Sequence, residues 1–219
     1  KAQALGYRNI GFILDRGYFS KANIEDLDRR KYNFLIMAKG RKSLVSSLVL
    51  GVKGSFEDKS ANTIWEYEVN GTTVEAKLYS DDRRTRCFHI YYSAQNHAAE
   101  RSAFETCIKK MAGMLERLLG RKCNDLNLDA YGKYFDLTFS DDRDRVLLAC
   151  SKNNKAIDDY IGYCGYFCLI SSERMTARDA LLLYKSRDYS EKLFSADKTF
   201  LCGSLEIPKM IVSISLFWS

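Results

Sequence analysis

The first forty residues contain two short apolar runs separated by a charged segment, and this order constrains the fold more than any other feature. Residues 9–14 (NIGFIL) and 32–38 (YNFLIMA) are short and apolar, as is typical of buried strands. Between them, Ser20 precedes residues 21–30, which carry acidic residues early and arginines late, as in a helix with a serine N-cap. Strand, helix and strand in this order predict a βαβ unit and therefore a parallel sheet.

The middle of the chain has the pattern of an antiparallel sheet with one long helix. Residues 63–78 alternate around Asn70-Gly71, a pair that predicts a β-hairpin turn. Residues 97–119 carry apolar side chains at helical spacing, which predicts a long amphipathic helix. We therefore expect residues 43–159 to form a β-rich insertion domain with one long helix.

The α/β pattern returns after this insertion. Residues 165–170 (GYFCLI) predict a buried strand, and Thr176 with Asp179 three positions later predicts the capped start of a helix. The expected fold class is therefore α/β, with one domain built from two segments and interrupted by the insertion. The predicted segments of that domain are 1–42 and 160–200, and residues 201–219 form an atypical tail.

Charge and hydropathy exclude some classes of protein. The chain of 219 residues has 34 Lys and Arg against 28 Asp and Glu, and this net charge of +6 permits a polyanionic partner without requiring one. No stretch approaches the roughly 18 apolar residues that span a bilayer, and the first residues lack the layout of a signal peptide. We therefore expect a cytoplasmic protein with no membrane partner.

Several basic residues outside these elements fit either a nucleic-acid backbone or a solvated surface. They are Arg83, Arg84 and Arg86, followed by Lys109, Lys110, Arg117, Arg121 and Lys122. Taken one by one, a solvated loop or helix face is the simpler interpretation, and the sequence leaves both open.

Four polar residues share one stripe of the last predicted helix. Tyr184, Arg187, Glu191 and Lys198 are three, four and seven positions apart, so they fall on one narrow helical face, whereas apolar residues such as Leu182 face elsewhere. One interpretation is a solvated face with an ion pair between Arg187 and Glu191. The other is a surface that meets a ligand.

A carboxylate also stands where ligands bind in α/β sheets. Asp15 directly follows the first predicted strand, at its carboxyl end. An aspartate before Arg16-Gly17 is also an ordinary turn former. Together with Glu191, however, Asp15 offers the oxygen ligands that Mg²⁺ takes.

The stripe and the strand-end aspartate together resemble a known enzyme family. The spacing Y-x2-R-x3-E-x6-K in YKSRDYSEKLFSADK is similar to the motif of the DDE transposases of insertion sequence family four. GFILDRGYFSKANI resembles the segment around the second catalytic aspartate of that family, and GYFCLISSE resembles the strand before its catalytic helix. The resemblance covers residues 9–40 and 160–198.

The resemblance implies an RNase H-like catalytic domain, incomplete in this chain. It implies phosphodiester hydrolysis and strand transfer at insertion-sequence ends, with Mg²⁺ or Mn²⁺ as cofactor. Asp15 and Glu191 are then the second and third acidic metal ligands. Tyr184, Arg187 and Lys198 are expected to contact the transposon-end DNA, Tyr184 by stacking on an unpaired base. The expected partners are double-stranded DNA and a second copy of the chain in a synaptic complex.

Two departures from the family limit what this chain is expected to do. The fourteen residues before Asp15 contain no acidic residue, so the first catalytic aspartate of the family is missing. Residues 201–219 match nothing expected after Lys198. We therefore expect a transposase fragment with impaired activity, and the alternatives are a non-catalytic DNA-binding remnant and a plain nuclease of the same fold.

Overall fold

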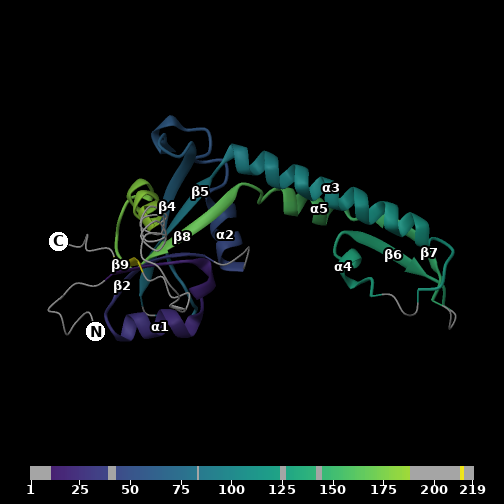
Figure 1. The fold of residues 1–219 in the computed structure, drawn as a ribbon, viewed down its shortest axis with the longest axis horizontal. Coiled ribbons are helices and arrows are strands. Elements are labelled where there is room, and N and C mark those ends of the chain that lie inside the picture. Colours follow the sequence, from purple (N-terminus) through teal and green to yellow (C-terminus); the bar gives the residue numbers. More distant parts are fainter. Residues whose placement is uncertain are drawn as a thin grey trace, which may run out of the picture. The chain divides into compact units, whose positions relative to one another are not determined.

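The computed structural model describes residues 11–38, 43–82, 84–123, 127–141, 145–187 and 213–214 (Figure 1). Its strands are β1 (Gly11–Leu14), β2 (Asn33–Met37), β3 (Thr63–Ile64), β4 (Val69–Lys77), β5 (Thr85–Tyr92), β6 (Phe135–Phe139), β7 (Leu147–Lys152), β8 (Tyr166–Ser171) and β9 (Ser213–Ile214). Its α-helices are α1 (Lys21–Arg29), α2 (Ser43–Val52), α3 (Ala94–Leu118), α4 (Asp129–Gly132), α5 (Asn154–Ile161) and a further helix over residues 177–187. The chain is a mixed α/β protein with two compact units, one of residues 1–92 and 166–219 and the other of residues 93–165.

The first unit is built on one mixed sheet with the strand order β3-β4-β5-β8-β2-β1-β9. β1 and β2 are parallel, with Phe12 opposite Phe34, and α1 connects them. The remaining neighbours pair antiparallel, and Figure 1 shows β4, β5 and β8 as long adjacent strands. The predicted βαβ unit is confirmed, but the parallel sheet expected from it is wrong, because among the described strands of this sheet only β1 and β2 pair in parallel.

Local sequence explains why α1 begins and ends where it does. The Ser20 hydroxyl accepts a hydrogen bond from the Asn23 N–H at 3.2 Å, which satisfies one of the donors left open at a helix start. Near the other end, Arg30 pairs with Asp26 at 2.8 Å. Lys31 then adopts a positive φ of 56°, which ends the helix before β2.

Helices cover both faces of this sheet. Helix 177–187 places Ala177, Ala180, Leu181 and Tyr184 against Ile13, Leu35, Tyr91 and Leu169. Its start is capped as predicted, since the Asp179 N–H donates to the Thr176 hydroxyl at 3.1 Å. Successive strand residues point to opposite faces, so Phe34 lies on the other side, under the Arg86 side chain that pairs with α1.

The hairpin turn predicted at Asn70-Gly71 is wrong. The chain turns between Ile64 and Tyr67, where the Tyr67 N–H donates to the Ile64 carbonyl at 3.1 Å, and both predicted turn residues lie inside β4. A Cβ atom at Gly71 would lie 2.9 Å from the ring of Tyr91, so the glycine is needed for close packing rather than for a turn.

The insertion boundary predicted at residue 43 also needs correction. β4 and β5 belong to the main sheet, because β5 pairs along most of its length with β8. The second unit therefore runs from Ser93 to Gly165. The alternation of apolar and polar residues predicts that β4 and β5 are strands. It does not predict that β5 pairs with β8, a strand about eighty residues later in the sequence.

The second unit is organised around the 25-residue helix α3 and the antiparallel pair β6–β7. Phe104, Ile108 and Leu115 of α3 are buried with Phe135 and Leu147 in a separate core. The helix ends before Gly120, which has a positive φ of 72°, as predicted for its stop.

Candidate functional site

Three of the predicted site residues meet at the carboxyl end of β1. The Tyr184 hydroxyl lies 3.4 Å from Asp15 Oδ1, a contact between residues 169 positions apart in sequence. Arg187 Nη1 lies 3.9 Å from the same oxygen. The other two predicted residues, Glu191 and Lys198, lie outside the described residues.

The end of β1 fixes the Asp15 carboxylate in place. Its Oδ1 accepts a hydrogen bond from the Arg16 N–H at 2.7 Å and caps the short 3₁₀ turn Arg16–Tyr18. The side chain is 55% exposed, and Oδ2 takes no part in the contacts with Arg16, Tyr184 and Arg187. Asp15 is therefore both a turn former and a strand-end carboxylate whose Oδ2 makes none of these three contacts.

Arg187 is a largely buried cation beside this exposed carboxylate. Its side chain is 14% exposed, and its guanidinium lies 4.9 Å from the centre of the Tyr184 ring. The ring holds the guanidinium by a cation–π contact, which orders it next to Asp15. Because the ion pair is long and Asp15 is exposed, we expect it to stabilise the fold by less than about 1 kcal/mol.

Tyr184 does not lie on an exposed face, and this prediction is wrong. The residue is 4% exposed and belongs to the core under helix 177–187, with its hydroxyl 3.9 Å from Met37 Sδ. A ring in this place does not offer a face to an unpaired base. Ala177 and Ala180 pack in the same core cluster, and these small residues let the helix lie close to the sheet and turn Tyr184 inward.

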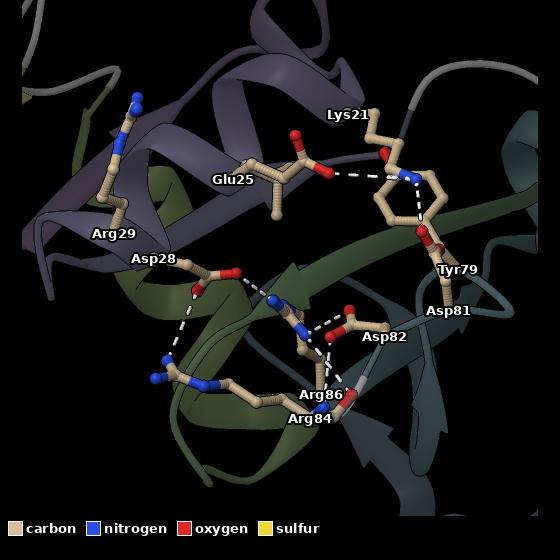
Figure 2. A pocket seen from close by; sticks show the side chains of 10 residues that line it. Lys21, Glu25, Asp28, Arg29, Tyr79, Asp81, Asp82, Arg84 and Arg86 are labelled. Atoms are coloured by element: carbon tan, nitrogen blue, oxygen red, sulfur yellow. Dashed lines mark hydrogen bonds and ion pairs between the residues drawn. The ribbon is translucent and has the colours of Figure 1, made fainter.

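A second charged group, which the sequence did not single out as a site, lines a cavity of about 400 Å³ beside α1 (Figure 2). Arg86 is its centre, with a side chain that is 3% exposed. It donates to Asp82 Oδ2 at 2.8 Å through Nη1 and to Asp28 of α1 through Nη2. Nearby, Lys21 pairs with Asp81 at 2.8 Å.

The charged side chains around this cavity connect α1 to the sheet and do not form an open charged site. We call Arg86 with its partners Asp28 and Asp82 the Arg86 clasp. Its lining holds as many acidic as basic side chains, and the innermost of them, Arg86, is paired. Arg86 is therefore not available to a nucleic-acid backbone, while Arg84 is exposed and lies 3.7 Å from Asp28. Arg83 lies outside the described residues.

His89 is a buried titratable group in the middle of the sheet. Its Nε2 lies 2.9 Å from Ser171 Oγ, which itself donates to the Glu173 carbonyl at 2.6 Å. Ser171 has one hydrogen to give, so it accepts from Nε2–H, and Nδ1 accepts from the Thr73 hydroxyl at 2.9 Å. Burial lowers the pKa of His89 to about 4. With no exposed surface, the neutral ring serves the sheet and not a ligand.

The site at β1 supplies part of what a metal ion needs. Within the described ranges, no group of three or more His, Cys, Asp or Glu side chains is placed to hold a metal ion. Asp15 is the predicted acidic ligand that these ranges include, and its Oδ2 suits a hard divalent cation that keeps several waters. A complete site therefore depends on at least one further carboxylate.

Comparison with known proteins identifies no relative. No protein-family model matches the chain, and neither a curated protein nor a solved structure is significantly similar to it. In the part of the chain that the structure describes, no helix combines the length and the apolar character needed to cross a membrane.

Proposed function

We propose that this chain is the core of a DDE-type DNA transposase of insertion sequence family four, which cuts phosphodiester bonds and transfers strands with Mg²⁺ or Mn²⁺. The observation that carries the proposal is the meeting of Asp15 with Tyr184 and Arg187, which come from two separate segments with the family spacing. A catalytic site requires these three residues to lie close together. A solvated helix face would not require Tyr184 and Arg187 to contact Asp15.

The arrangement of β1, α1 and β2 supports an RNase H-like domain. The two strands are parallel and Asp15 stands at the carboxyl end of one of them, the edge at which α/β sheets bind ligands. Helix 177–187 then brings its own residues to that edge. Fold and site are thus consistent with one another, and both belong to the same unit.

Asp15 and Glu191 would hold the divalent ion, which supplies activation of the attacking oxygen and stabilisation of the leaving one. Arg187 balances the charge of Asp15 when no ion is bound and presents a planar cation to phosphate oxygens at the same place. Tyr184 positions Asp15 through its hydroxyl and Arg187 through its ring. Lys198 adds a second cation on the stripe predicted from sequence.

The distribution of charge supports a DNA partner for this unit. Residues 93–165 contain eleven Lys and Arg and eleven Asp and Glu, so the whole excess of six positive charges belongs to the unit that carries Asp15. A basic excess near a cutting site raises the local concentration of a polyanion. Double-stranded transposon ends and target DNA, held by two copies of the chain, are the proposed partners.

Replacing Asp15 by asparagine is expected to lower DNA cleavage on the order of a hundredfold or more, since the metal ion loses a charged ligand. The assay follows conversion of supercoiled plasmid to nicked and linear forms by the full chain with Mn²⁺. Glu191→Gln is expected to lower DNA cleavage to a similar extent. Asp81→Asn removes a 67% exposed carboxylate in the same unit and is the matched control that keeps activity.

Cleavage that survives Asp15→Asn and Glu191→Gln alike would contradict the assignment of both residues. Salt-sensitive DNA binding without any cleavage by the wild-type chain would favour the non-catalytic DNA-binding alternative. Cleavage that is independent of transposon-end sequence would favour the plain nuclease.

A further inference from the structure

The second half of α3 carries a group of unpaired positive charges on the surface of the second unit. Lys109, Lys110 and Arg117 are exposed, and Arg121 follows just after the helix. We call Lys109, Lys110 and Arg117 the basic face of α3. None of these three makes an ion pair with any residue that the structure describes, whereas Arg101, in the first half of the same helix, pairs with Glu105 at 2.8 Å.

The sequence explains why these charges stay unpaired. Ion pairs on a helix surface join residues three or four positions apart. Lys110 and Arg117 have no acidic residue at those positions, and Glu105, four before Lys109, already pairs with Arg101. The helix dipole favours a cation in the last turn, which accounts for Arg117 but not for lysines two turns earlier.

The surface around the basic face carries few large apolar side chains. Several residues on this side of the helix are small, namely Ala99, Ser102, Ala103, Thr106 and Gly113, whereas Met114 lies between Lys110 and Arg117 and Glu116 lies seven positions after Lys109. The large apolar residues of α3, Phe104, Ile108 and Leu115, are buried in the core of the unit, and Met114 is the large apolar residue left exposed. A helix that binds a membrane surface needs a broad apolar face beside its cations, and this one lacks it.

We propose that the basic face of α3 binds the phosphate backbone of duplex DNA. This inference rests on the proposed function and adds to it a DNA contact on the second unit. Lys110 and Arg117 are seven residues apart, about 10 Å along the helix axis. Over about 10 Å a duplex presents roughly six phosphates, enough for each of the two cations to meet one.

The test is binding of a fluorescein-labelled 20-base-pair duplex to the full chain without divalent metal, followed by fluorescence anisotropy over a series of salt concentrations. The triple variant Lys109→Gln, Lys110→Gln and Arg117→Gln is expected to bind about tenfold more weakly. Its plot of log affinity against log salt is expected to be shallower by about 2 to 3, close to 0.9 for each lost phosphate contact.

A matched triple variant removes the same charge elsewhere on the same unit. Lys133→Gln, Lys152→Gln and Lys155→Gln change three exposed lysines outside α3, and we expect the wild-type slope. Thermal unfolding of both variants is expected to match the wild-type chain, because all six side chains are exposed.

The outcomes separate this inference from the proposed function. Equal slopes for the two triple variants would overturn the DNA contact on α3, and cleavage by the wild-type chain would still support the transposase proposal. Loss of binding to phosphatidylserine vesicles in the α3 variant, with DNA binding intact, would show a membrane partner and overturn the inference. A wild-type chain that binds no DNA would overturn both.

Discussion

Replacing Arg86 by methionine is expected to lower the free energy of unfolding by about 3 kcal/mol, because two carboxylates are left facing each other beside the sheet. The Arg86 side chain is 3% exposed, and its partners Asp28 and Asp82 are only 23% and 15% exposed. Methionine keeps most of the apolar volume, so the loss reports the charges rather than a cavity. Urea unfolding of the full chain at neutral pH measures it.

The exposed pair of Arg30 and Asp26 is the matched control for this prediction. It has the same chemistry and the same 2.8 Å separation as Arg86 with Asp82, but Arg30 is 59% exposed. Arg30→Met is expected to change the free energy of unfolding by less than about 1 kcal/mol. Adding Asp28→Asn and Asp82→Asn to Arg86→Met is expected to restore most of the stability. Equal effects of Arg86→Met and Arg30→Met would mean that the clasp does not hold α1 to the sheet.

His89 is expected to make the protein unstable in mild acid. Burial lowers its pKa from 6.5 to about 4. Between these two pH values the imidazole is protonated in the unfolded chain but stays neutral in the folded chain. The free energy of unfolding therefore falls as the pH is lowered from about 6.5 towards 4, and the loss from pH 7.5 to 4.5 is about 2.5 kcal/mol from this residue. Unfolding in urea at both pH values gives the difference.

His89→Gln is expected to remove this part of the pH dependence, whatever it costs in stability at neutral pH. Cys168→Ala is the control, since it changes a buried residue of β8 next to Leu169, which lies opposite His89, but keeps the imidazole. Burial raises the pKa of the Cys168 thiol to about 12, so the thiol does not titrate in this window. The same acid loss in His89→Gln as in the wild-type chain would contradict the assignment.

Local sequence was enough to predict the elements that surround the site. Ser20 and Thr176 cap helices as expected, and the apolar runs that end at Leu14 and Met37 form parallel strands. These features depend on neighbours within a few residues, and their patterns are visible in one sequence. The resemblance implied that Asp15 and Arg187 belong to one site, but it did not predict their direct contact.

Features set by distant contacts were missed. Asn70-Gly71 has the composition of a turn but lies within β4. The glycine is needed there because the Tyr91 ring of the neighbouring strand leaves no room for a Cβ atom. Tyr184 has a polar end and was placed on an exposed face, yet its ring completes the core. Arg86 and Asp28 of the clasp are 58 positions apart, and the local sequence does not predict which carboxylates pair with that guanidinium.

Binding of Mn²⁺ tests most directly whether Asp15 and Glu191 form one metal site. Electron paramagnetic resonance of free Mn²⁺, titrated with the full chain in the absence of DNA, measures the bound fraction. We predict a bound fraction for the wild-type chain that falls with Asp15→Asn and equally with Glu191→Gln, and that Asp81→Asn leaves unchanged. Binding that is the same in the wild-type chain, Asp15→Asn and Glu191→Gln would contradict the account.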